Sequence, residues 1–292
     1  MPPAARVTDP TTHGAPLSPG PGSVNVVIAA LAAWRTTIDQ HACPATSISG
    51  PDGVGSVLLG SPTVWINAQM ACRQGDIVVE KPGLAMGPAD PILMGCLTVD
   101  IGGPVASISI TGGVMTATWG GLTITGSPSD VTTFVSMLSA MALNSRTGAG
   151  VLATITGDTG HPVTCRVGRN QPGVFGDAFN TNAVDLADLQ GFPASARAGH
   201  NDFTTDEALV HFLTERHNSA ANGSNFNTAH QAGINAQNQL RGETGQSQVV
   251  SQQLAGHDAA GNSIARFTYA DGTHEDYVIG PGGNIVSRTP AP

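Results

Sequence analysis

The chain has 292 residues, long enough for two domains, and only 11% of them are charged. Its 37 glycines and 20 prolines favour a turn-rich, strand-rich protein and argue against a helical bundle. A formal net charge of −9 offers no basic surface for nucleic acid, so no nucleic-acid partner is expected.

The N-terminus lacks the basic segment and apolar run of a secretory signal peptide. The longest apolar run near the start, residues 24–34, is too short to span a bilayer, so no stable membrane anchor is expected. The four cysteines form no CxxC pair and no short disulfide framework. These features predict synthesis in a reducing cytoplasm and export by a machine that reads no cleaved leader.

A short pattern recurs three times in residues 1–103, and each copy places a candidate metal ligand four residues after an aspartate. The copies are Arg6–His13, Arg35–Cys43 and Arg73–Glu80. The candidate ligands are His13, His41, Cys43 and Glu80. Runs rich in β-branched residues at 23–28, 61–66 and 96–101 predict short strands between the copies. Three such units around a pseudo-threefold axis would converge on one ion, which would stabilise a domain with a small core.

Four motifs in residues 1–103 resemble the PAAR-repeat proteins, which form the pointed tip of the type VI secretion spike. The motifs, in chain order, are Pro3–Arg6, Asp9–Gly14, Gly60–Val64 and Arg73–Asp76. The resemblance implies a mainly β PAAR cone with pseudo-threefold repeats that sits on a trimeric VgrG spike and carries zinc near its apex. Carried over by position, it implies His13, His41 and Cys43 as ligands. Glu80 stands where the family has His or Cys, so a Glu oxygen, a water or no fourth ligand all fit.

Two further cysteines, Cys72 and Cys96, occupy positions of small residues in the repeat and are interpreted as packed side chains. After the repeats, residues 104–126 alternate between apolar and polar types with glycines between the runs. This pattern predicts antiparallel strands at 105–110, 114–119 and 122–125, which would form a β-extension or linker.

Residues 127–292 predict a C-terminal α+β domain. Ser127 and Pro128 begin a helix that runs to about residue 144, and the glycine-rich segment 147–150 is expected to end it. Helices are also predicted from a capping box at 204–207 and at 226–240. Strands are predicted at 151–155, 163–167, 184–189, 247–254, 264–270 and 274–279. The tail, 280–292, is expected to lack regular structure.

A second candidate metal site consists of His211 and Glu215, one helical turn apart, and His230 on the next helix. Zinc metallopeptidases hold their ion in this way and leave a fourth position open for water. Residues 127–245 weakly resemble zincin-like effector domains of bacterial secretion systems. Such peptidases carry a Glu base where this chain has Phe212, so Glu207 is the nearest candidate base. The alternatives are a helix-surface hydrogen bond, a metal site without peptidase chemistry, or an active metalloenzyme.

Together these patterns predict a type VI secretion spike-tip protein that caps the VgrG trimer through its zinc-binding PAAR domain. The expected domains are residues 1–103 (PAAR domain), 104–126 (β-extension) and 127–292 (effector cargo). The PAAR part is not expected to be an enzyme. The cargo is alternatively a metal-dependent, peptidase-like toxin or a non-enzymatic adaptor for another effector. A chaperone, an adaptor and an immunity protein are candidate further partners. Export by a contractile machine would carry the protein to a target cell or the medium.

Overall fold

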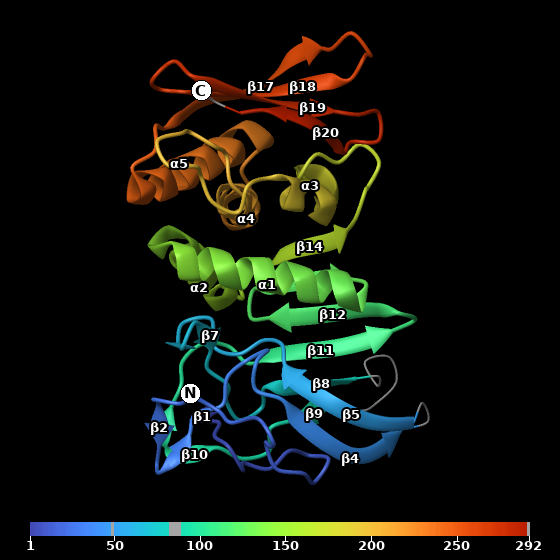
Figure 1. The fold of residues 1–292 in the computed structure, drawn as a ribbon, viewed down its shortest axis with the longest axis vertical. Helices are drawn as coiled ribbons and strands as arrows, with labels where there is room; N and C mark the ends of the chain where they lie inside the picture. Colours follow the sequence, from blue (N-terminus) through green and yellow to red (C-terminus); the bar gives the residue numbers. More distant parts are fainter. Residues whose placement is uncertain (48–49, 82–88, 291–292) are drawn as a thin grey trace. The chain divides into compact units, whose positions relative to one another are not determined.

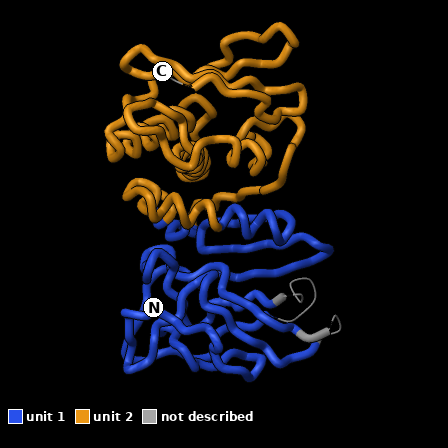
Figure 2. Tube along the Cα trace, in the orientation of Figure 1, with its two compact units in different colours: residues 1–135, 153–159 blue, residues 136–152, 160–292 orange. Residues whose placement is uncertain are grey.

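The computed structural model describes residues 1–47, 50–81 and 89–290. It is a mixed structure with more strand than helix and with several sheets. The chain divides into two compact units, shown in Figure 2. Unit 1 contains Met1–Val135 and Ala153–Thr159, and unit 2 contains Ser136–Leu152 and Gly160–Pro292. Each unit is described by itself below.

Three equivalent turns organise unit 1. In each turn an arginine donates hydrogen bonds from its guanidinium and its own backbone N–H to the next aspartate. The pairs are Arg6–Asp9 at 2.7 Å, Arg35–Asp39 at 2.9 Å and Arg73–Asp76 at 2.9 Å. The sequence repeat therefore recurs as three turns with the same hydrogen bonds.

A ring of backbone hydrogen bonds joins the residues that precede these arginines. The N–H of Ala5 donates to the carbonyl of Cys72, that of Cys72 to Trp34, and that of Trp34 to Ala5. The three bonds measure 2.9, 3.0 and 2.9 Å. The Cys72 side chain is fully buried in one core cluster, together with Trp34, and Cys96 lies in a second cluster. Both cysteines are free, as their interpretation as packed side chains requires.

Two of the three strands predicted between the repeats are shorter than expected, and the third is present as β10 (Cys96–Asp100). Residues 23–28 contribute only β2 (Val27–Ile28), which pairs with β3 (Leu31–Ala32). Residues 61–66 contribute only β6 (Trp65–Ile66), which pairs with β7 (Gln69–Met70). The preceding residues form turns because the hydroxyls of Ser23 and Ser61 accept hydrogen bonds from backbone N–H groups two and three residues later. At the third position β10 (Cys96–Asp100) pairs with β1 (Pro3–Ala4).

A four-stranded antiparallel sheet in unit 1 was not predicted. It contains β4 (His41–Ser47), β5 (Gly50–Val57), β8 (Ile77–Lys81) and β9 (Asp90–Pro91), in the order β4-β5-β8-β9. Glycine, proline and aspartate are frequent in these strands, so the sequence carries a weak strand signal. Gly55 is paired with both His41 and Glu80, and a Cβ atom there would lie 2.8 Å from the Glu80 side chain. Glycine therefore leaves room for Glu80 beside β5.

Three strands follow in unit 1, as predicted from the alternating pattern. They are β11 (Ala106–Thr111), β12 (Val114–Trp119) and β13 (Leu122–Gly126), joined as antiparallel neighbours (Figure 1). Trp119 is fully buried, and its indole N–H donates to the carbonyl of Gly60 at 3.1 Å. The β-extension is therefore anchored to the repeat region by a side-chain hydrogen bond.

The helix that begins after Ser127 is α1 (Pro128–Asn144), and its boundaries agree with the prediction. The predicted break at 147–150 and strand at 151–155 are wrong, because α2 (Arg146–Gly157) covers both. The hydroxyl of Ser145 accepts the N–H of Gly148 at 2.7 Å and so caps the new helix. Gly148 serves close packing, since a Cβ atom there would lie 2.5 Å from the Met141 carbonyl oxygen.

This packing predicts opposite effects of alanine at two glycines of α2. Gly150→Ala should stabilise the protein by up to about 1 kcal/mol, because its Cβ meets no atom within 4 Å and alanine favours helix. Gly148→Ala should destabilise it by about 1–3 kcal/mol, because the Met141 backbone must move. Urea unfolding followed by circular dichroism at the helix band measures both. A Gly148→Ala variant as stable as the parent would contradict the packing argument.

After Gly160, unit 2 contains three short strands. The strands are β14 (Val163–Gly168), β15 (Asp177–Ala178) and β16 (Ala183–Asp185), with β14 parallel and β15 antiparallel to β16. The strand predicted at 184–189 is half wrong, because α3 (Leu186–Gly191) follows β16 directly. The Asp185 carboxylate accepts the N–H groups of Ala187 and Asp188 and thereby starts the helix.

Two long helices and an antiparallel sheet complete unit 2. The helices are α4 (Thr205–Asn222) and α5 (Phe226–Thr244). The sheet contains β17 (Val249–His257), β18 (Ser263–Tyr269), β19 (His274–Ile279) and β20 (Ile285–Thr289). Figure 1 shows this sheet as a layer beside α3, α4 and α5.

The C-terminal tail contains a strand that was not predicted. β20 pairs with β19, and Arg288 on β20 forms ion pairs with the buried carboxylates of Asp202 and Glu275. Burial opposes ionisation of Asp202, but hydrogen bonds from Arg197 and the charge of Arg288 lower its pKa to about 2. The tail is ordered by these charges, which a search for apolar periodicity does not detect. Residues 291–292 of the predicted tail lie outside the described residues.

Candidate metal centres

Six metal-binding side chains converge on the β4-β5-β8-β9 sheet of unit 1. We call them the six-donor cluster: His13, His41, Cys43, Asp52, Glu80 and Asp90. His13 comes from the first Arg–Asp repeat, and the strands β4, β5, β8 and β9 supply the other five. They form two overlapping groups of four that share Cys43 and Glu80, and the donor atoms of each group lie within 4.8 Å of one another. Five segments of the chain therefore meet at one buried point.

The carboxylate of Asp90 holds the loop that carries His13. One carboxylate oxygen of Asp90 accepts the N–H of His13 at 2.8 Å and the hydroxyl of Thr12 at 3.0 Å. The Nδ1 atom of His13 then lies 3.4 Å from the Cys43 sulfur and 3.2 Å from Glu80 Oε2. A tetrahedral zinc ion about 2.0–2.3 Å from its ligands spaces them roughly 3.3–3.8 Å apart. The two distances from His13 Nδ1 are therefore close to what such an ion requires.

The protonation state of His41 favours a cation at this cluster. Its Nδ1 lies 2.9 Å from the carbonyl oxygen of Pro16, which only accepts, so Nδ1 must carry the proton. A neutral His41 therefore directs the lone pair of Nε2 toward the carboxylates of Asp90 at 3.6 Å and Glu80 at 4.0 Å. Burial lowers the pKa of His41, which disfavours a second proton on the ring. A lone pair and two carboxylates face one another, and a cation between them would remove the repulsion.

Several buried atoms of the six-donor cluster, including His41 Nε2, have no hydrogen-bond partner. Among the described residues, Nε2 of His41, Oδ1 of Asp52, Oε1 of Glu80 and Oδ2 of Asp90 are buried without a hydrogen bond. Such groups are rare in folded proteins and call for an ion or a water. Burial raises the pKa of the Cys43 thiol to about 12, and a hydrogen bond with Glu80 adds to this effect. Burial also raises the pKa of Glu80. The cluster is thus costly in its charged form unless a cation neutralises it.

The structure places the four sequence-predicted residues in the two overlapping groups, His13 in one and His41 in the other, and adds two candidate donors that were missed. Glu80 belongs to both groups and lies beside His13. Asp52 and Asp90 were not predicted because neither follows the repeated Arg–Asp spacing. Their positions depend on the pairing of β5 with β4 and of β9 with β8, which is a long-range feature. Asp52 does lie in a Pro-Asp-Gly segment, but that pattern indicates only a turn.

The second candidate centre lies in unit 2 between α4 and α5. His211 Nε2, Glu215 Oε2 and His230 Nδ1 form a triangle with sides of 3.1, 3.0 and 3.0 Å. The predicted helix start is confirmed, since Thr204 is the N-cap of α4 and its hydroxyl accepts the N–H of Glu207. This start fixes His211 and Glu215 on the same face of the helix. We call the three residues the His211 triangle.

Close approach of the two helices makes this triangle possible. Gly233 of α5 lies against the backbone of His211, and a Cβ atom there would be 2.8 Å from the His211 carbonyl oxygen. His230 lies one turn before Gly233 and is thereby brought to the His211 ring. Gly233 could have predicted this contact from the sequence, because a glycine inside a helix often marks close helix packing.

A chain of side chains behind His211 fixes its orientation. Its Nδ1 lies 3.1 Å from the Oε1 atom of Gln237, which also accepts a hydrogen bond from Gln252 at 2.8 Å. Gln237 in turn donates from Nε2 to Glu207 at 3.4 Å. His211 Nδ1 therefore carries a proton, and Nε2 of a neutral ring presents a lone pair to Glu215. The contact between His211 Nε2 and Glu215 needs either a second proton on the ring or a metal ion. A hydrogen bond at the other ring nitrogen, here from Nδ1 to Gln237, is typical of histidines that bind metals.

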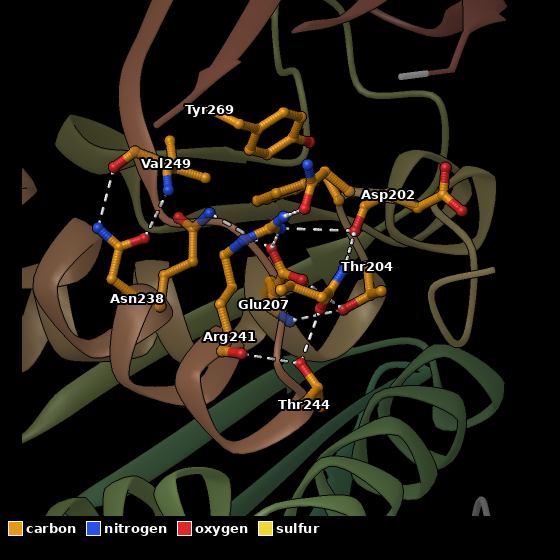
Figure 3. Close-up of polar contacts among 12 residues, drawn as sticks. Asp202, Thr204, Glu207, Asn238, Arg241, Thr244, Val249 and Tyr269 are labelled. Atoms are coloured by element: carbon orange, nitrogen blue, oxygen red, sulfur yellow. Dashed lines mark hydrogen bonds and ion pairs between the residues drawn. The ribbon is translucent and has the colours of Figure 1, made fainter. Parts of the chain in front are cut away.

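Glu207, the candidate base, occupies a different environment. It is fully buried and forms an ion pair with Arg241 at 2.7 Å, and the guanidinium of Arg241 lies over the Tyr269 ring (Figure 3). Burial raises the pKa of Glu207 to about 7, although Arg241 opposes the shift. Its contact with the His211 triangle is indirect, through Gln237. Glu207 therefore helps to position Gln237, which contacts His211, and it does not contact the triangle itself.

The His211 triangle opens into a pocket of about 220 Å³. Phe212 lines this pocket at the position where a peptidase base was sought. Asp177 lines it as well, and its carboxylate accepts a hydrogen bond from Arg216 at 3.1 Å. Burial raises the pKa of Asp177, and the charge of Arg216 opposes this shift. Apart from Glu215, Asp177 is the only carboxylate among the described residues that line the pocket.

When the His211 ring carries its second proton, hydrogen bonds from His211 and His230 keep Glu215 ionised. Burial opposes its ionisation, but these bonds lower the pKa of Glu215 to about 2. The triangle therefore combines one carboxylate with two imidazoles, a donor set that zinc accepts.

None of the helices in the described residues has the length and hydropathy of a membrane span. Searches among protein-family models, curated proteins and solved structures found no match to the chain.

Proposed function

We propose that residues 1–103 form a zinc-bound PAAR cone that caps the trimeric VgrG spike of a type VI secretion machine. The remainder of the chain would travel with the cone as cargo. The observation that carries this proposal is the six-donor cluster, in which the lone pair of His41 faces two buried carboxylates. The three Arg–Asp turns and the ring of backbone hydrogen bonds support a pseudo-threefold cone around it.

The donor chemistry favours zinc over other divalent ions. Imidazole and thiolate ligands suit zinc, whereas magnesium and calcium prefer sites made of oxygen alone. Cys43 and Glu80, which the two groups share, would provide sulfur and oxygen ligands, and His13 with Asp52 or His41 with Asp90 would complete the set. Asp90 accepts the backbone N–H of His13 and would hold that ligand in place. Metal binding would remove the unpartnered buried atoms that the cluster contains.

A bound ion would give the cone mechanical strength. The core clusters of the repeat region are small, and one of them contains only Trp34 as an aromatic side chain. An ion coordinated by His13, β4 and β8 would connect segments distant in the sequence and resist their local opening. A spike tip that must keep its shape under load requires this property.

Docking on the spike tests the proposed function directly. The full-length protein, loaded with zinc, should co-elute with the VgrG trimer of its own secretion machine in a ratio of one chain to three. The His13→Ala and Cys43→Ala variants should lose most of this complex, because the cone is less ordered without its ion. Failure of the zinc-loaded parent protein to bind the trimer would contradict the proposal.

A second candidate function concerns unit 2, for which the His211 triangle favours a metal-dependent hydrolase carried as cargo. The lone pair of His211 Nε2 and the Glu215 carboxylate converge at the wall of a pocket, as an open metal site requires. A metal ion bound there would supply an acidic water for attack on a carbonyl group. The residues of the chain would hold the metal, exclude water through the apolar pocket wall, and accept a proton at Asp177. Phe212 cannot accept that proton.

A further inference from the structure

Phenylalanines are concentrated around the His211 triangle. Only 4% of the residues are aromatic, and eight of them are phenylalanines. Seven of these eight line the pocket beside the triangle: Phe175, Phe179, Phe192, Phe203, Phe212, Phe226 and Phe267. The eighth, Phe134, lies in α1. The chain thus gathers nearly all its phenylalanine at one place.

These rings come from many parts of unit 2 and contact one another. Phe192 and Phe203 meet edge to face at 5.0 Å between ring centroids, and Phe203 stacks on Phe267 at 4.4 Å. At the other side of the group, Phe179 meets Phe226 at 5.5 Å. Segments from residue 175 to residue 267 therefore converge on the same apolar surface, which is the arrangement of a built binding site.

The group has a buried floor and an exposed rim. Phe192, Phe203, Phe212 and Phe267 are each at most 5% exposed and form the floor. Phe226 is 49% exposed and stacks on the His230 ring at 5.0 Å, so the rim lies against a metal-binding residue. A bound apolar group that covered this ring would remove apolar surface from water. The rim is therefore suited to close over a bound apolar group.

The size and polarity of the pocket define the ligand. A cavity of about 150 Å³ lined by apolar side chains binds benzene, and this pocket measures about 220 Å³. It accommodates one phenyl-sized group and part of its linker. The polar side chains of the lining residues are those of the His211 triangle, Asp177 and Gln252. A ligand must therefore place its apolar group among the phenylalanines and its polar group at the triangle.

We propose that this pocket binds an aromatic side chain of a peptide or amide ligand, with the adjoining carbonyl oxygen at a metal ion held by His211, Glu215 and His230. The proposal rests on the second candidate function and adds its substrate class. Selection for aromatic side chains follows because a smaller group leaves the phenylalanine rim in contact with water.

Two hydroxamates provide the test, because both bind zinc and only one carries a phenyl group. Isothermal titration calorimetry of the zinc-loaded full-length protein should show 3-phenylpropanohydroxamic acid binding about 10- to 100-fold tighter than acetohydroxamic acid. Phe179→Ala, at the partly exposed rim, should reduce that ratio to about threefold or less. Phe134→Leu, outside the pocket, should leave the ratio as in the parent protein.

The outcomes separate this inference from the function on which it rests. Equal affinity for both hydroxamates, with a full zinc content, would overturn the aromatic pocket and leave the metal centre intact. Absence of binding by both compounds, with zinc content unchanged by His211→Ala, would overturn the metal centre and the inference together. A ratio that Phe134→Leu reduces as strongly as Phe179→Ala would also contradict the proposed position of the phenyl group.

Discussion

Replacement of Cys43 or His13 by alanine should release one zinc ion per chain and destabilise unit 1. A ligand present at 1,000 times its dissociation constant stabilises a folded protein by about 4 kcal/mol. Loss of that contribution corresponds to a fall in melting temperature of roughly 10 °C or more for a unit of this size. All three tryptophans, Trp34, Trp65 and Trp119, lie in unit 1, so tryptophan fluorescence reports its unfolding. Zinc content by mass spectrometry and a fluorescence melt measure the two effects.

Cys96 offers a matched control for the cysteine. It is buried and lies in a core cluster apart from the six-donor cluster, and the equivalent positions of the repeat carry Ser23 and Ser61. Cys96→Ser should therefore keep the zinc ion and most of the stability.

The affinity of the six-donor cluster for zinc should fall as the pH is lowered, because the ion must displace protons from Cys43 and Glu80, whose pKa values are raised by burial. Full zinc retention by both the His13→Ala and Cys43→Ala variants would contradict the proposed zinc site.

Arg73→Ala should destabilise unit 1 by about 3–5 kcal/mol, which is typical of a buried ion pair that loses one partner. The Arg73 and Asp76 side chains are fully buried. The guanidinium of Arg73 also donates to the carbonyl oxygens of Gly102, Gly103 and Pro104, which would lose these hydrogen bonds. Arginine at this position thus joins the third repeat to the end of the repeat region. Urea unfolding followed by tryptophan fluorescence measures the loss.

Arg6 provides the comparison within the same repeat. Its side chain is 18% exposed, and its ion pair with Asp9 is closer to solvent. Water can replace part of the lost interaction there, so Arg6→Ala should cost about 1 kcal/mol. The two turns share the same Arg–Asp geometry, so the difference between the two variants reports burial together with the Arg73 hydrogen bonds to residues 102–104. Equal losses would show that the Arg73 contacts with residues 102–104 do not contribute.

The features that sequence reasoning predicted are those set by local spacing. The Arg–Asp turns close within three or four residues, so their recurrence along the chain predicts their recurrence in space. The capping box at Thr204 fixed the start of α4, and with it the shared face of His211 and Glu215. These interactions depend on neighbouring residues and therefore survive in any fold that contains them.

The features that were missed depend on long-range pairing. Asp52 and Asp90 reach the six-donor cluster only because β5 and β9 pair with strands that the sequence indicates weakly. The glycines at 147–150 were interpreted as a break, but Gly148 allows close packing against Met141. Glu207 was chosen as a base for its distance along the helix, whereas its partner Arg241 lies 34 residues away. Local spacing does not reveal a tertiary partner.

An anomalous-scattering map at the zinc absorption edge, from crystals of the zinc-loaded full-length protein, tests the central claim most directly. The account predicts a strong peak inside the six-donor cluster, within about 2.0–2.3 Å of His13, Cys43 and Glu80. It predicts a second peak at the His211 triangle. A well-ordered cluster of His13, Cys43 and Glu80 without any anomalous peak would contradict the zinc-bound cone.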